Sequence, residues 1–513
     1  MSKRILALAL AAVIALSLVA CGGGATKNEA ASADPLTKDD IVQVYITSSG
    51  SWPYKDDWKV WQYIREGFGG TLDLTVIPLA EQSTKWPILF ASPDLLPDIM
   101  TDSRTACPYR GADKVAIDIN SLVDDYMPNY KAWRDGLDED KYALYILPNV
   151  DTEGKMFSAP TSGFESSGGQ HAWLYRKDIF DKHNLKVPTN ADELYEVCKQ
   201  LKALYPNSYP FCMRDLVSKI GIMGPAFDGY WELDYYYDYE TETWKHGVLE
   251  DTAIETLTFF KKFIDEGLMP PNAVNIAPSE WEELIMSDRG FIFFDFMTRI
   301  DNFNSKMSGT DFMVSAFAPF AILDSGSAKT ANTAVGSATM FVCNSRNDRR
   351  IANAAKYIDW FYTDEACELL SWGKEGETYN VVDGKRVFIT DENNNIPKVV
   401  FGFQTDGAGL RKDPAASDAF DTAELAAVKP MILETTMPKL NPKNYMCLSA
   451  DDMKNVIDTN VAINNYKNEM LGKFLLGQAS LDNFATFQKD FEALGVNDVL
   501  KVYEEAYEKI SAN

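Results

Sequence analysis

Aromatic side chains beside turn-forming and polar residues are the groups in this sequence best suited to non-covalent ligand chemistry. Flat rings match the apolar faces of a ligand, and carboxylates, amides and guanidinium groups match its hydroxyls. The candidates that stand where loops leave predicted strands or helices are Trp52, Tyr54, Trp173, Trp231 and Trp372, the last with Glu375 nearby. A single tryptophan is more often a core residue than a ligand platform. The surrounding turn and polar residues favour ligand contact for Trp52, Trp231 and Trp372.

Four polar residues complete the predicted binding set. Asp295 interrupts the apolar run 291–297. A buried strand carboxylate needs a partner, and Arg299 could supply it. Structural pairing and ligand binding both remain open for these two residues. Asp102 and Gln170 each lie at the end or the start of a predicted element, where loops hold ligand-binding residues, and we predict that they contact ligand.

The sequence does not contain the residue patterns of several common kinds of catalytic site. The three histidines, His171, His183 and His246, are too few and too scattered for a histidine metal cluster. There is no Gly-x-Ser-x-Gly elbow, P-loop or dinucleotide-binding glycine pattern. We therefore predict no catalytic residue, cofactor or metal. Glycoside hydrolysis needs only two carboxylates, so the alternative to a binding protein is an exported carbohydrate hydrolase or lyase.

The N-terminus has the pattern of an export signal. Lys3 and Arg4 precede the apolar run 5–20, which predicts a signal peptide over residues 1–20. The sequence Leu-Val-Ala-Cys-Gly at 18–22 resembles the lipobox of bacterial lipoproteins, which implies that Cys21 is lipidated. Residues 21–37 are small and polar, as expected of a flexible tether. We expect a protein held on the cell membrane by lipid, facing the extracellular side.

Charge and length narrow the partners and the size of the fold. The chain carries 75 acidic and 49 basic residues, a formal charge of -26, which disfavours nucleic acid as a partner. Roughly 475 residues follow the tether, more than one hydrophobic core usually holds, so two lobes or more are expected. We predict buried free thiols, with disulfides as the alternative, for Cys107, Cys198, Cys212, Cys343, Cys367 and Cys447.

Along the chain, segments with the two-residue hydrophobic period of strands alternate with segments that have the 3.6-residue period of helices. Residues 41–46 and 71–77 read as strands, and 58–68, 190–205 and 351–372 read as helices. Such alternation predicts α/β layers.

A series of sequence blocks resembles extracellular solute-binding proteins of the sugar-binding family. Gly-Lys-Met-Phe-Ser-Ala-Pro at 154–160 is similar to a strand of that family. Residues 173–194 are similar to its next strand, its Arg-Lys-Asp helix and the turn after it. Asn184 replaces the usual glycine of that turn. Further similar blocks lie at 96–99, 355–365, 372–379 and 491–507. Their order along the chain carries the resemblance.

The resemblance implies a two-lobe, periplasmic-binding-protein-like α/β fold (type II) with a hinge and a ligand cleft. Lobe 1 would hold 38–158 with 318–375, and lobe 2 would hold 159–317 with 376–513. The implied function is capture of a small solute, an oligosaccharide in the first place, and its delivery to the permease subunits of an ABC transporter. We expect a monomer. A structural surface lipoprotein is the third class considered.

Overall fold

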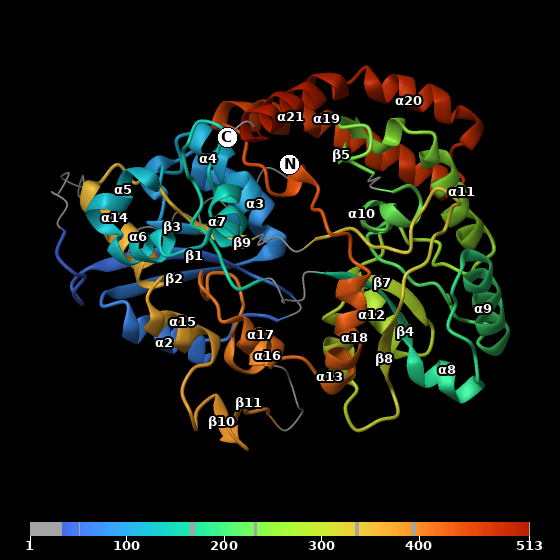
Figure 1. Ribbon diagram of the computed structural model, residues 1–513, viewed down its shortest axis with the longest axis horizontal. Helices are drawn as coiled ribbons and strands as arrows, with labels where there is room; N and C mark the ends of the chain where they lie inside the picture. Colours follow the sequence, from blue (N-terminus) through green and yellow to red (C-terminus); the bar gives the residue numbers. More distant parts are fainter. Residues whose placement is uncertain are drawn as a thin grey trace, which may run out of the picture.

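The structure is a computed structural model that describes residues 33–50, 52–164, 170–229, 233–333, 338–391 and 397–511. The predicted signal peptide, Cys21, the start of the tether and Trp231 lie outside the described residues. Two sheets with helices around them stand side by side in Figure 1.

The first sheet has the strand order β2-β1-β3-β9. Its strands are β1 (Ile41–Ser48), β2 (Thr71–Pro78), β3 (Ile99–Ser103) and β9 (Ala338–Val342). Strand β1 pairs in parallel with β2 and β3, and β9 closes the edge antiparallel to β3. Val42, Val44 and Ile46 are buried along β1, so the predicted strand forms because alternate side chains enter the core.

Helices cover this first sheet. They are α2 (Lys59–Gly67), α3 (Gln82–Phe90), α4 (Cys107–Ala112), α5 (Asn120–Tyr126), α6 (Pro128–Asp135), α7 (Glu139–Tyr145), α14 (Asp348–Trp360) and α15 (Asp364–Ser371). The side chain of Asn347 caps α14 by accepting a hydrogen bond from Arg350 N. Ala354, Ala355 and Ile358 of α14 are buried, and they join the core that contains β1.

The second sheet has the order β7-β4-β8, and both pairings are antiparallel. Its strands are β4 (His171–Arg176), β7 (Ile292–Phe296) and β8 (Val314–Phe317). All six residues of β4 are buried, as expected of a central strand covered on both faces. A separate hairpin joins β5 (Tyr235–Asp238) to β6 (Thr243–His246).

The helices near the second sheet come from two stretches of chain. The first stretch gives α8 (Lys177–His183), α9 (Ala191–Leu204), α10 (Leu216–Ile222), α11 (Thr252–Asp265), α12 (Pro278–Met286) and α13 (Arg299–Lys306). The second gives α18 (Ala423–Glu434), α19 (Ala450–Leu475), α20 (Phe484–Glu492) and α21 (Val496–Ser511). Asn190 caps α9, as predicted, and Asn184 ends α8 in the left-handed conformation at φ 51°.

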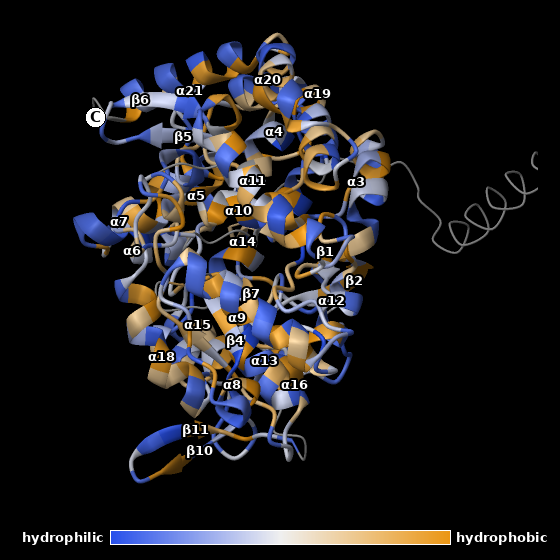
Figure 2. Cartoon of the chain, turned by 90° about the vertical axis from the view of Figure 1, so that its right-hand side faces the viewer, coloured by the Kyte–Doolittle hydropathy of each residue, from blue (hydrophilic) through white to orange (hydrophobic). Residues whose placement is uncertain are grey.

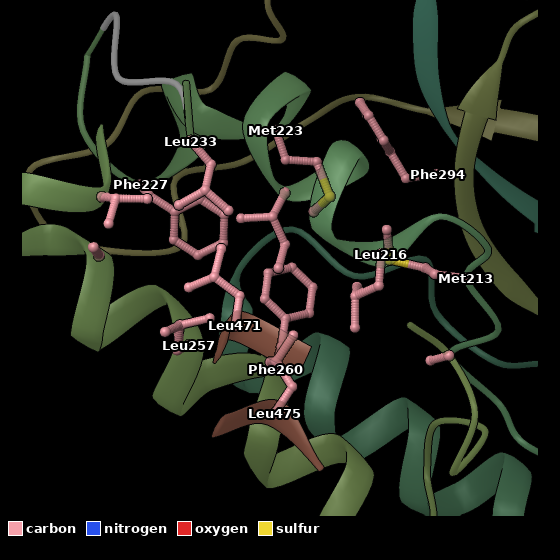
Figure 3. Packing of buried hydrophobic residues seen from close by; sticks show 14 of the residues in the cluster. Met213, Leu216, Met223, Phe227, Leu233, Leu257, Phe260, Phe294, Leu471 and Leu475 are labelled. Atoms are coloured by element: carbon pink, nitrogen blue, oxygen red, sulfur yellow. The ribbon is translucent and has the colours of Figure 1, made fainter. Parts of the chain in front are cut away.

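The largest apolar cluster joins these two stretches. Figure 3 shows Leu471 and Leu475 of α19 beside Leu257 and Phe260 of α11, all of them buried. Hydrophobic and hydrophilic residues alternate along α19 and α21 (Figure 2), so each can bury one face only. No helix within the described ranges is long and apolar enough to span a membrane.

The packing differs from the expected lobe boundaries at two places. Phe320 packs with the second sheet, although residues from 318 onward were expected with the first. Residues 379–416 pack with the first sheet, although those from 376 onward were expected with the second. This later stretch holds the projecting β10 (Tyr379–Val382) and β11 (Lys385–Phe388) hairpin (Figure 1), α16 (Pro397–Phe401) and α17 (Pro414–Asp418). Stacking of Phe388 on Trp372, with 5.0 Å between ring centroids, joins the hairpin to α15.

All six described cysteines are free thiols, which confirms the expectation. Five are buried and Cys367 is partly exposed.

Candidate ligand cleft

A cavity of about 860 Å³ lies between elements of the two sheet regions, within the usual size of a ligand cleft. Residues that belong to the first region line one side: Ser49, Gly50, Trp52, Leu79, Lys398 and Gln404. Residues of the second region line the other: Arg214, Glu282, Phe296, Arg299, Asp301 and Asn302, with Lys306 beside them. We call these sides the first and the second wall.

The first wall presents a ring and one cation. Trp52 is half-buried, in the loop after β1, and Lys398 Nζ lies 4.1 Å from the centroid of its ring. Burial, and next the nearby Lys412, lower the pKa of Lys398 to about 8. Tyr54 lies behind Trp52 in a small adjoining hollow, where its hydroxyl accepts a hydrogen bond from Arg65. The structure thus places Trp52 on the cleft and Tyr54 next to it.

Ion pairs build the second wall around Asp295, whose side chain is fully buried. Arg214 donates from Nε to Oδ2 at 2.8 Å and from Nη2 to Oδ1 at 3.0 Å. Arg299 Nε lies 3.6 Å from Asp295 Oδ1, so the pairing that the sequence left open is present, and Arg299 Nη1 donates to Glu282 Oε1 at 2.9 Å. Burial opposes ionisation, but Lys219 and Arg214 outweigh it and lower the pKa of Asp295.

A buried tryptophan orients the two guanidinium groups. The rings of Trp281 lie 5.2 Å from the Arg214 guanidinium and 5.3 Å from that of Arg299. Trp281 has no exposed surface, and its Nε1 donates to Cys212 O at 3.0 Å. Because the hydrogen bond from Nε1 fixes the position of the ring, the ring in turn supports the orientation of both guanidinium groups before a ligand binds.

Lys219 and His171 extend this network behind the wall. Lys219 Nζ lies 3.7 Å from Asp295 Oδ2 and 2.8 Å from His171 Nε2. Burial, and then Lys219, hold the pKa of His171 well below its usual range, so the imidazole is neutral and accepts this hydrogen bond at Nε2. Nδ1 then carries the proton and faces Thr333 Oγ1 at 3.3 Å. Burial likewise lowers the pKa of Lys219 to about 8.

Gln170 and Asp102 have structural partners away from the cleft. Gln170 is buried and donates from Nε2 to Asn332 Oδ1 at 2.9 Å, joining two segments that approach the second sheet. Asp102 accepts from Arg110 Nε at 3.1 Å. Neither residue lines the 860 Å³ cavity.

Trp173, Trp372 and Glu375 take other places than the predicted ligand contact. Trp173 on β4 is 1% exposed and stacks on Phe320 with 5.5 Å between ring centroids. Trp372 is 5% exposed, stacks on Phe388, and donates from Nε1 to Asp413. Both rings are core side chains because their faces are already covered. Glu375 is exposed in the loop before β10, outside the cavity.

Several lining residues are not predicted by the local sequence pattern, chief among them Arg214, Lys398, Asp301 and Asn302. Asp301 Oδ1 accepts from Thr422 N at 3.1 Å and from its hydroxyl at 2.7 Å, and burial raises the pKa of Asp301 to about 7. Asn302 is buried, and its Oδ1 has no hydrogen-bond donor among the described residues. For Asp301 and Asn302 the sequence does hold a signal, the polar first turn 299–302, which begins three residues after a buried strand ends.

Three kinds of comparison place the chain among known proteins. A family model described as bacterial extracellular solute-binding protein matches residues 55–366. A putative binding protein of Brucella abortus (strain 2308) is 26% identical over 268 residues, which are 50% of this chain and 56% of that protein. The match thus spans little more than half the length of such relatives.

Solved structures share the fold. The alginate-binding protein AlgQ2, in a structure without calcium ion, superposes with a TM-score of 0.72 at 18% identity, covering 91% of this chain and 98% of that one. The Streptococcus pneumoniae ABC-transporter substrate-binding protein FusA, an EF-hand mutant in complex with fructo-nystose, gives 0.73 at 17% identity over 92% and 100% of the chains. These likenesses confirm the predicted two-lobe α/β fold. The family match covers more than half of this chain, which therefore belongs to the bacterial extracellular solute-binding proteins.

Proposed function

We propose that this protein captures an oligosaccharide in the 860 Å³ cleft and delivers it to the permease subunits of an ABC importer. The cleft itself is the observation that carries the proposal. One wall offers the flat face of Trp52, and the other offers guanidinium groups, the Glu282 carboxylate and the Asn302 amide. This combination suits the C–H faces and the hydroxyls of a sugar chain.

The family and the solved structures support the same ligand class. FusA was solved with fructo-nystose, and a solute-binding protein for N-glycan transport from Streptococcus pneumoniae, with the same fold, was solved with Man5GlcNAc. In this chain the cavity draws on both sheet regions, so a bound solute would join the walls and favour a closed state. We also propose that the two sheet regions act as two lobes that close on the solute, and that the protein is a monomer.

The proposed anchor is the lipidated Cys21 after a cleaved signal peptide, with the following residues as a tether on the extracellular side of the cell membrane. Cys21→Ala should leave folding intact and release the protein from the membrane or leave its precursor uncleaved. Normal membrane retention of a correctly cleaved Cys21→Ala protein would contradict the anchor.

A thermal-shift and calorimetry panel tests the capture proposal. Peptides, polyols and oligosaccharides are added to the mature protein, and oligosaccharide binding is expected to be one-to-one with a Kd on the order of 1 μM. Ligand binding to the folded state must also raise the Tm. Appearance of a reaction product without stable binding would favour the carbohydrate-active enzyme instead.

A further inference from the structure

We propose that the oligosaccharide taken by this cleft carries an anionic substituent, a carboxylate or a sulfate, held between Lys398 on the first wall and the Arg299–Lys306 pair on the second. This inference rests on the proposed function and adds the charge class of the solute. Among the described residues, four of the seven charged side chains that line the cavity are basic, namely Arg214, Arg299, Lys306 and Lys398. The whole chain has the opposite balance, 49 basic to 75 acidic residues.

The acidic side chains of the cavity already have partners. Asp421 accepts from Lys429 Nζ at 2.7 Å. Glu282 accepts from Arg299 Nη1 at 2.9 Å and from Lys306 Nζ at 2.6 Å, so one carboxylate is shared by two cations. Asp301 is bound by Thr422, and its raised pKa leaves it partly protonated at neutral pH. Behind the wall, Asp295 is shared by Arg299, Arg214 and Lys219, and Asp215 pairs with Arg214. Three carboxylates thus face four cations, so the second wall keeps an excess of positive charge.

Lys398 is the matching cation of the first wall. Within the described parts of the chain, no other charged residue of that wall lines the cavity, and no carboxylate forms an ion pair with Lys398 Nζ. Its lowered pKa agrees with this geometry, since burial and Lys412 disfavour the charge and the nearby Asp406 offsets them only in part. An anion in the cleft would favour the charged form again.

The cations on both walls also affect the closure of the cleft, that is, the approach of one wall to the other. Bringing the walls together without an anion places like charges closer in a water-poor space, which costs energy. A carboxylate or sulfate between them changes repulsion into attraction on both sides, and guanidinium groups bind such oxyanions strongly. A neutral sugar offers hydroxyls but leaves the repulsion in place. The cleft should therefore discriminate by charge as well as by shape.

The test uses three trisaccharides that share a backbone: one with uronate carboxylates, its carboxyl-reduced neutral form, and a sulfated form of the neutral one. Calorimetry with the mature protein at pH 7 should show at least tenfold tighter binding of one anionic form than of the neutral form, and the two anionic forms distinguish carboxylate from sulfate. Lys398→Met should remove most of that preference. Lys501→Met, an exposed lysine of α21 with the same charge change, should leave it intact. Near pH 8 the anionic form should be bound with proton uptake, seen as a dependence of the heat on buffer.

The outcomes separate this inference from the proposed function. Equal or tighter binding of the neutral trisaccharide overturns the anionic substituent and leaves oligosaccharide capture standing. An anionic preference that survives in Lys398→Met overturns the role of the first wall. Binding of none of the three, with clear binding of a peptide or polyol, overturns the inference together with the proposed function.

Discussion

The two walls of the cleft are built in different ways. The first wall places Trp52 on a surface loop, with Lys398 over its ring and little else to hold it. The second wall fixes Arg214 and Arg299 through one fully buried carboxylate and one fully buried tryptophan. A wall that is organised before ligand arrives is also part of the folded core. Changes in the second wall should therefore alter stability and binding together, whereas changes in the first should alter binding alone.

The largest effect is expected from removing the carboxylate of the second wall. Asp295→Ala leaves Arg214, Arg299 and Lys219 without their shared buried partner. The free energy of unfolding should fall by about 3–5 kcal/mol, the usual result of breaking a buried ion pair from one side. Urea denaturation at pH 7 measures this loss. Asp113→Ala, which removes an exposed ion pair with Lys454, is the control and should cost under about 1 kcal/mol.

A pH test shows whether the charges or the packing of Asp295 matter. The folded-state pKa of Asp295 is lowered, so its stabilisation is present above the unfolded pKa and is lost as the pH falls through the folded value. The stability gap between wild type and Asp295→Asn should therefore narrow toward acid pH. A gap that is constant with pH would mean that Asp295 acts by packing alone, and the second wall would lose its electrostatic character.

Asp301→Asn should have the next largest effect, and it should be stabilising. The folded-state pKa of Asp301 is raised to about 7, so between pH 4 and 7 the folded protein binds more protons than the unfolded chain. The stability of the wild type then falls as the pH rises through this window. Asparagine can still accept from Thr422, and it should add roughly 2–4 kcal/mol at pH 8. Urea titrations from pH 4 to 8 should show the gain growing up to pH 7; a gain that is independent of pH would contradict the burial of this carboxyl.

Local sequence signals predicted much of the fold and suggested one ion pair of the second wall. Strand β1 and the capped helix α9 follow from alternation and from Asn190, which act over a few residues. Arg299 was a candidate partner for Asp295 because a buried strand carboxylate needs one, and the two residues are four positions apart and form an ion pair. Proximity along the chain was enough for these features.

Long-range partners could not be predicted. Arg214 reaches Asp295 from 81 residues away, and Lys398 reaches Trp52 from a stretch expected in the other lobe. Trp372 was predicted to contact ligand because turn and polar residues surround it. Its ring is in fact covered by Phe388, which comes from a hairpin whose packing the local pattern does not determine. Trp173 lies on a strand that is buried on both faces, so the polar loop before this strand does not indicate that the ring contacts ligand.

Trp52→Ala tests the opposite behaviour of the first wall. Loss of its ring should weaken oligosaccharide binding by roughly 1–3 kcal/mol, the value of a buried aromatic contact. The Tm of the free protein should change little, because the ring is half-buried on a loop. Trp372→Ala is the matched variant, since it removes a core tryptophan and should lower the Tm. Similar Tm losses in both variants would remove the proposed difference between the walls.

The smallest effect is expected at Asn302, and it asks whether every polar group of the second wall serves the fold. Asn302 is buried, lines the cavity, and has no donor for its Oδ1 among the described residues. A sugar hydroxyl could donate to it. Asn302→Ala should therefore weaken binding by about 0.5–1.5 kcal/mol, the net value of one hydrogen bond, with the Tm nearly unchanged.

Asn304, on the same helix α13, is the matched control for this last variant. Its side chain accepts from Val314 N at 2.7 Å and donates to Val314 O at 3.0 Å, so it ties α13 to strand β8. Asn304→Ala should lower the Tm and leave the affinity intact, the reverse of Asn302→Ala. If both variants lose stability and neither loses affinity, the unpaired oxygen of Asn302 has no ligand role, and the second wall binds solute through its charged groups alone.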